Sequence, residues 1–69
     1  MTKYDIKMIE TCIALARYAR DKVEQLQYNP AIRLATKNND TFAWLEEAVD
    51  DINEAIHDLY DVIEFAKYD

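Results

Sequence analysis

The sequence predicts an all-α protein, and three observations carry that prediction. The 69 residues include no glycine and one proline, so few positions favour turns. Hydrophobic residues make up 51% of the chain, enough for long amphipathic helices. They recur at alternating spacings of three and four, the period of helices that pack along a shared seam. We therefore expect one helical domain over residues 1–69.

The clearest helix is expected over about residues 41–67. Its apolar residues follow an unbroken heptad pattern, whose positions we letter a to g, with a and d on the seam. Position g holds Ala48, Ala55 and Val62, which widens the apolar stripe enough to face two neighbouring helices. The seam itself comprises Phe42, Val49, Ile56 and Ile63 at a, and Leu45, Ile52, Leu59 and Ala66 at d.

Another long helix is expected over about residues 3–28, with a less regular stripe. Small residues on its seam would let the other long helix approach closely, and Cys12 is interpreted as a core thiol. The large side chains beside the seam exceed what one partner helix can cover, which favours a second copy of the chain. The seam is Ile9, Cys12, Ala16, Ala19, Val23 and Leu26, flanked by Ile6, Met8, Ile13 and Leu15.

A short helix is expected between these two, over about residues 30–37. Asn29 and Pro30 are typical of an N-cap and a first helical residue. Asn38, Asn39 and Asp40 are expected to end this helix and to cap the next. The chain would then be a helical hairpin with a short connecting helix. Two copies would form an antiparallel four-helix bundle.

The length of the chain also favours self-association. A chain of this size buries only about 60% of the surface that its unfolded form exposes. Its single cysteine rules out an intrachain disulfide bond, one common remedy for a small core. A homodimer is the expected alternative.

The first twenty residues indicate neither a signal peptide nor a membrane span. Six of them are charged, and the longest apolar run extends only over residues 12–16. The lone thiol is typical of a reducing compartment. We expect a cytoplasmic protein that does not bind membranes, located in the host cytoplasm if it is encoded by a phage.

Charge is distributed very unevenly along the chain. Residues 1–39 hold seven basic and four acidic side chains, whereas residues 40–69 hold one basic and ten acidic. A polyanionic surface repels nucleic acid and attracts basic proteins. Eight carboxylates within residues 46–64 are therefore the candidate partner-binding residues: Glu46, Glu47, Asp50, Asp51, Glu54, Asp58, Asp61 and Glu64.

The pattern of these carboxylates suggests more than a solubilising surface. Like charges three or four residues apart oppose helix formation, and aspartate is a poor residue inside a helix. Five of them are spaced by four, three, four and three residues, forming a second heptad away from the apolar seam. Trp44 and Phe65, at position c, are expected to add apolar anchors to this surface or to cover a dimer seam.

Two motifs suggest metal chemistry, and neither predicts a site. Glu54 and His57 have the Glu-x-x-His spacing of ferritin-like di-iron proteins, but their heptad positions point away from the seam where such ligands lie. "EEAVD" at residues 46–50 resembles the first half of the acidic motif of MazG-like nucleotide pyrophosphatases, whose second half is matched only nearly by residues 58–61. We expect no catalytic residue, metal or cofactor.

Two resemblances suggest a function. Small size, helicity and strong negative charge resemble the phage-encoded DNA-mimic proteins, which implies that the carboxylates block the basic DNA-binding surface of a host protein. The opening "MTK" and "ARYARDKVEQL" at residues 16–26 resemble the first helix of Rop-like RNA-binding dimers. That resemblance implies RNA contacts by Lys3, Tyr4, Lys7, Arg17 and Tyr18. A plain structural dimer is the remaining alternative. Under the DNA-mimic hypothesis, the chain itself binds no nucleic acid.

Overall fold

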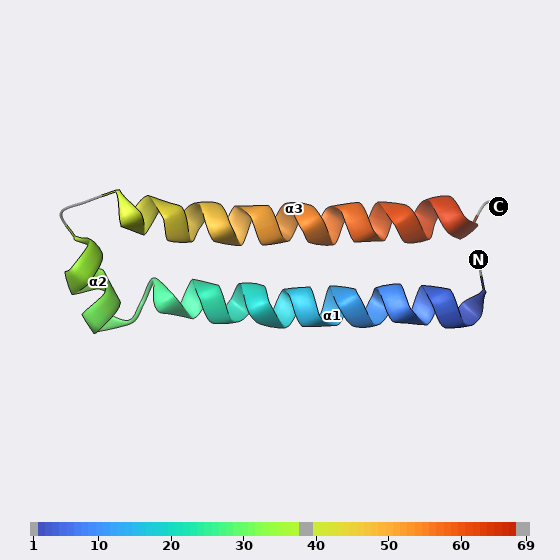
Figure 1. Cartoon of the computed structure of the whole chain (residues 1–69), viewed down its shortest axis with the longest axis horizontal. Coiled ribbons are helices and arrows are strands. Elements are labelled where there is room, and N and C mark those ends of the chain that lie inside the picture. The colour runs from blue at the N-terminus through green and yellow to red at the C-terminus, as the bar shows by residue number, and fades with distance from the viewer. Residues whose placement is uncertain (1, 38–39, 68–69) are drawn as a thin grey trace.

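The computed structural model describes residues 2–37 and 40–67, and shows an all-α hairpin over this part of the chain. Helix α1 spans Lys3–Leu26, α2 spans Pro30–Thr36 and α3 spans Thr41–Lys67, without a strand among the described residues. The two long helices lie side by side and antiparallel, and α2 crosses one end of the pair (Figure 1). The all-α prediction is confirmed.

Helix α1 begins with a capping box. The Asp5 amide donates to Thr2 Oγ1 at 3.1 Å, and the Thr2 amide donates to Asp5 Oδ2 at 3.0 Å. These reciprocal bonds satisfy backbone donors that have no partner inside the helix. The backbone bond from Thr2, followed by the bond to its side chain, lowers the pKa of Asp5 below 3.8.

The turn into α2 has the predicted cap. Asn29 Oδ1 accepts from the amides of Ala31 and Ile32, at 3.0 and 3.2 Å, and Pro30 occupies the first turn of the helix. Both predicted roles are therefore confirmed. Asn38 and Asn39, expected to separate α2 from α3, lie outside the described residues.

The seam of α3 is as predicted. Every a and d residue from Phe42 to Ala66 is buried or half-buried, with Ile56 and Ile63 the most enclosed. Position g is only partly covered, because Ala48 is half-buried while Ala55 and Val62 are exposed. One partner helix therefore covers the seam but not the whole apolar stripe.

The predicted seam of α1 is wrong at alternate positions. Cys12, Ala19 and Leu26 are exposed, and Ile13 is instead the buried residue of this helix. The observed seam is Ile6, Ile9, Ile13, Ala16, Arg20, Val23 and Gln27, all of them buried or half-buried.

Two polar residues explain that error. Arg20 and Gln27 occupy seam positions, and a long polar side chain can cover apolar surface with its stem while its head reaches a polar partner. Arg20 Nη1 donates to Asn53 Oδ1 of α3 at 3.0 Å, and its guanidinium also pairs with Asp21 at 3.2 Å. A stripe chosen for apolar content alone omits these positions and shifts toward Cys12.

The core of the hairpin is small. Ile13, Ile56 and Ile63 form its buried cluster, with partly buried Ile, Leu and Ala side chains packed around it. The molecule is elongated, with principal extents of 51 × 16 × 10 Å. A two-helix layer of this shape leaves one side of each long helix without a covering element.

Candidate functional site: the acidic face of α3

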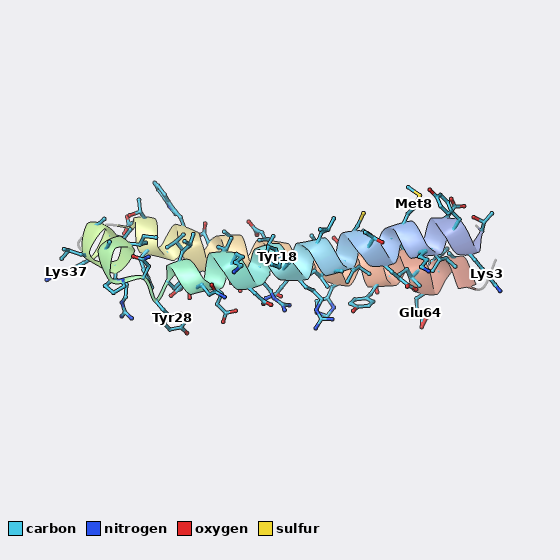
Figure 2. The ribbon with its side chains drawn as sticks, turned by 90° about the horizontal axis from the view of Figure 1, so that it is seen from below. Lys3, Met8, Tyr18, Tyr28, Lys37 and Glu64 are labelled. Atoms are coloured by element: carbon cyan, nitrogen blue, oxygen red, sulfur yellow. The ribbon has the colours of Figure 1, made fainter. Side chains whose placement is uncertain are left out.

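The acidic face is a surface along α3 that carries eight carboxylates and no lysine or arginine between Glu46 and Glu64. All eight side chains are exposed, and none forms a salt bridge with a side chain described over residues 2–37 and 40–66. Figure 2 shows Glu64 projecting away from the pair of long helices. The face comprises Glu46, Glu47, Asp50, Asp51, Glu54, Asp58, Asp61 and Glu64.

Helix geometry aligns these carboxylates into rows. Glu47, Glu54 and Asp61 share the outermost heptad position, and Asp51 and Asp58 lie at position c. The eighteen residue steps from Glu46 to Glu64 extend over about 27 Å at 1.5 Å per residue. The charge density is then about one per 3.4–3.9 Å, close to the spacing of about 3.4 Å between phosphates along one strand of B-DNA.

Trp44 and Phe65 lie beside this face and are largely open to solvent. Their exposed fractions are 62% and 79%. Both share position c with Asp51 and Asp58, so the c row is apolar at its two ends and acidic in its centre. Neither ring contributes to the core of the hairpin.

The motifs that suggested metal chemistry do not assemble into a metal site. Glu54 and His57 are both exposed, as are Glu46, Glu47 and Asp50 of the "EEAVD" segment. Among the described residues there is no group of three or more His, Cys, Asp or Glu side chains that could hold a metal ion.

The expectation for Cys12 requires correction. Its thiol is free and exposed, whereas a core position was predicted. The physical reason is the shift of the α1 seam onto Ile13, which turns Cys12 to the side of the hairpin. There it lies one turn from Met8 and Leu15, which are also exposed.

The proposed RNA-contacting side chains are exposed along α1. They are not confined to the outer surface of the helix, because Arg17 borders the seam beside α3. Lys22 Nζ lies 5.3 Å from the centre of the Tyr18 ring, so a cation already occupies one face of that ring. The set comprises Lys3, Tyr4, Lys7, Arg17 and Tyr18.

A polar groove between the long helices was missed by the sequence prediction. Arg17 and Arg20 of α1 line it together with Asn53, His57 and Tyr60 of α3. A heptad frame that starts from Ile6, Ile9 and Ile13 places Arg20 on the seam of α1. That frame is the signal in the sequence that would have predicted the groove. The groove brings cationic and aromatic groups to the side of the hairpin opposite Met8.

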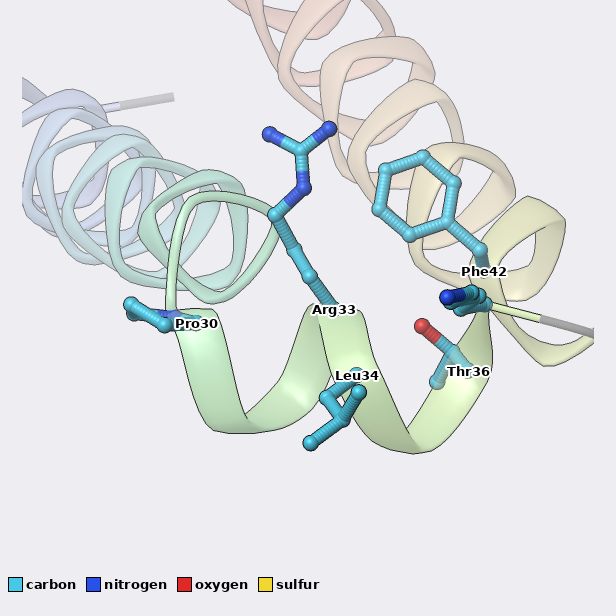
Figure 3. Close-up of a pocket in the computed structure, with 6 residues that line it drawn as sticks. Pro30, Arg33, Leu34, Thr36 and Phe42 are labelled. Atoms are coloured by element: carbon cyan, nitrogen blue, oxygen red, sulfur yellow. The ribbon is translucent and has the colours of Figure 1, made fainter.

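A second hollow lies where α2 meets α3. Arg33 and Phe42 project into it from the two helices, while Pro30, Leu34 and Thr36 complete the view in Figure 3. Lys37 also lines it. This end of the hairpin thus carries positive charge, in contrast to the acidic face.

The described helices include none that is long and apolar enough to cross a membrane. Comparison of the chain with protein-family models, curated proteins and solved structures found no match.

Proposed function

We propose that this chain is a non-enzymatic DNA mimic, whose acidic face binds and blocks the basic surface of a nucleic-acid-binding protein. The observation that carries the proposal is the exposure of all eight carboxylates on one helix, without a compensating salt bridge among the described residues. Solvated helices ordinarily mix charges, because Glu and Lys three or four residues apart stabilise the helix. This helix maintains negative charge at a small cost in its own stability.

The binding mechanism follows from the chemistry of carboxylates. Each can accept charge-assisted hydrogen bonds from lysine or arginine of a partner, as a phosphate does. Because the carboxylates are exposed, their attraction is screened by salt, and long-range steering weakens as ionic strength rises. The chain itself would be repelled by DNA, since both are polyanions.

The proposed active form is a homodimer, a four-helix bundle of two hairpins. The small core supports this assembly, because only Ile13, Ile56 and Ile63 are buried within the described residues of one chain. A dimer displays two acidic faces. The partner is then a basic DNA-binding protein, and no cofactor takes part.

The experiment that tests the proposal uses matched neutral variants as bait in bacterial lysate at low salt. The test variant carries Glu47→Gln, Glu54→Gln and Asp61→Asn on the outermost row of α3. The control carries Glu10→Gln, Asp21→Asn and Glu24→Gln on α1, the same chemical changes at exposed positions. Three lost contacts of about 1 kcal/mol each correspond to roughly a 100-fold loss of affinity.

We expect the unmodified chain and the control to retain basic nucleic-acid-binding proteins, and the test variant to lose them. Equal retention by all three baits would refute a role for the acidic face. RNA binding through α1 is the second candidate, favoured by the exposure of Lys3, Lys7 and Arg17. A gel shift of RNA by the purified chain would support that candidate and contradict the mimic.

A further inference from the structure

Helix α1 carries a second apolar stripe that α3 does not cover. It lies at heptad positions c and g, directly beside the observed seam, and runs along most of the helix. Large residues occupy position c in the first half, and smaller ones dominate position g. The stripe is Met8, Cys12, Leu15, Ala19 and Leu26, all exposed.

Helix α3 carries a matching stripe at the same heptad positions. Ala48, Ala55 and Val62 form its g row, and Trp44 and Phe65 stand at the ends of its c row. Only Ala48 among these is half-buried, and the other four are exposed. Between the two rings the c row is acidic, at Asp51 and Asp58, so the apolar part of the stripe is its g row together with the two rings.

The two stripes lie on the same side of the hairpin and together form one apolar face. When two antiparallel helices share an a/d seam, their g rows flank it on one side and their e rows on the other. The e side is identified by the groove that Glu10, Arg17 and Tyr60 line together. Figure 2 shows Met8 and Glu64 projecting to opposite sides of the molecule.

This face gathers the exposed apolar side chains selectively. Eleven large hydrophobic residues are exposed among those described, and six belong to the apolar face: Met8, Leu15, Leu26, Trp44, Val62 and Phe65. The others are four tyrosines, whose hydroxyl groups suit contact with water, and Leu34 on α2. The distribution matches an interface better than a solvated surface.

The chain exposes more surface than a compact monomer of its mass, and the excess is large enough for a dimer interface. The hairpin exposes 5597 Å² for a mass of 8.1 kDa. A compact monomer of that mass exposes only about 4500 Å². The excess, about 1100 Å², exceeds the roughly 800 Å² that each partner contributes to a standard protein interface. One second copy on the apolar face is sufficient to account for it.

We propose that a second copy of this chain docks on the apolar face, with the two-fold axis parallel to the long helices. In that arrangement α1 of each subunit packs against α3 of the other, and both α2 helices lie at the same end of the bundle. The inference specifies the dimer of the proposed function and does not depend on partner binding by the acidic face. Of that face, Asp51 and Asp58 at position c border the dimer interface, and the other six carboxylates remain for a partner.

Charge selects this arrangement over the other symmetric one. Helix α1 contains five basic and four acidic residues, a net charge of +1, whereas α3 contains one basic and eight acidic, a net charge of −7. A two-fold axis perpendicular to the helices would stack α3 on α3. It would bring the c row, with Asp51 and Asp58, next to the same row of the second copy. An axis parallel to the helices places each acidic helix against the nearly neutral α1.

The register of the hairpin supplies complementary contacts in this arrangement. Arg20 of α1 is level with Asn53 of α3, to which it bonds, and Ile13 of α1 is level with Tyr60 of α3, with which it lines a groove. Both pairs therefore have the same offset between the two helices. Because an axis parallel to the helices keeps both subunits level, that offset sets the neighbours across the dimer. It places Met8 level with the partner subunit's Phe65, a favourable sulfur–aromatic pairing. It also places Lys22 level with the partner subunit's Asp51, an oppositely charged pair.

The first test is the oligomeric state of the full chain and two matched variants. Ala19 lies in the middle of the apolar face, and Ala14 lies on the same helix at its polar side; both are exposed in the hairpin. Sedimentation equilibrium should give twice 8.1 kDa for the unmodified chain and for Ala14→Lys, and 8.1 kDa for Ala19→Lys. A monomeric unmodified chain, or a dimeric Ala19→Lys, would overturn the proposal.

Cys12 provides a readout that needs no substitution. Its thiol is exposed in the hairpin but lies on the apolar face, so docking should slow its alkylation by iodoacetamide at least tenfold at dimer-forming concentrations. Dilution should restore the fast rate. Alkylation that is equally fast at all concentrations would show that another surface, or none, mediates association.

The orientation is tested by exchanging one pair of charges. Lys22→Glu faces the partner subunit's Asp51, and Asp51→Lys faces the partner subunit's Lys22, so each variant alone should dimerise about tenfold more weakly. Their equimolar mixture restores both pairs and should dimerise like the unmodified chain. A mixture no tighter than either variant would refute the axis parallel to the helices.

Discussion

Truncation of Ile56 to alanine should remove a large part of the stability of the hairpin. Ile56 is 6% exposed and belongs to the buried cluster with Ile13 and Ile63. The substitution removes three carbon groups, which at about 0.8 kcal/mol each contribute about 2.4 kcal/mol of lost burial. Incomplete closure of the resulting cavity adds to this value, so we expect a loss of about 2–3 kcal/mol.

The size of that loss is large relative to the total. A chain of this length has a free energy of unfolding of about 3–10 kcal/mol at the usual value per residue. The matched control is Leu34→Ala, because Leu34 is 73% exposed on α2 and should change stability by less than about 0.5 kcal/mol.

The assay is urea unfolding followed by circular dichroism at 222 nm. All variants are compared at one protein concentration, because association would add a concentration-dependent contribution to stability. A loss for Ile56→Ala no greater than that for Leu34→Ala would refute the assignment of the core to this cluster.

Three further predictions concern local structure. Asn29→Ala removes the acceptor for two amides and should cost about 1 kcal/mol in urea unfolding, whereas no change would show that the cap contributes nothing. Asn53→Ala leaves the half-buried guanidinium of Arg20 without its α3 acceptor and should cost about 1 kcal/mol; Arg20→Met/Asn53→Ala should recover most of that loss, and no recovery would contradict the pairing. Because the pKa of Asp5 is lowered in the fold, the capping box should stabilise α1 fully at pH values well above 3.8 and lose this effect as pH falls through the folded-state pKa. Carbon NMR titration should place that pKa below 3.8, and a value at or above 3.8 would contradict the prediction. Thr2→Ala should raise the pKa only in part, because it removes the side-chain bond and keeps the backbone amide that lowers the pKa most.

The sequence predicts the α3 part of this fold well because its seam is purely apolar. Every a and d residue from Phe42 to Ala66 obeys the heptad rule, so periodicity alone identifies the buried side. The Asn29–Pro30 cap is equally predictable, because it depends on local chemistry and not on a distant partner.

The α1 seam was less predictable for a definite physical reason. Arg20 is placed there by a hydrogen bond to Asn53, thirty-three residues away in sequence, and such a tertiary pairing leaves no trace in local hydrophobicity. The error moved Cys12, Ala19 and Leu26 into the core, whereas the structure places them on the uncovered apolar face.

The exposure of the carboxylates follows directly from the α3 heptad. All eight acidic residues lie outside positions a and d, and all eight side chains are exposed. The choice of partner depends instead on the spacing of cations on another molecule, which periodicity in this chain does not encode. That choice is therefore a matter for binding measurements.

The most direct test of the central claim is displacement of DNA from a basic protein recovered by the bait experiment. That protein is first bound to fluorescently labelled duplex DNA, and fluorescence anisotropy is followed during titration with the full chain at low salt. The acidic face is expected to displace the DNA completely, whereas the variant with Glu47→Gln, Glu54→Gln and Asp61→Asn is not. A complex in which the chain and the duplex bind the protein simultaneously would contradict the account.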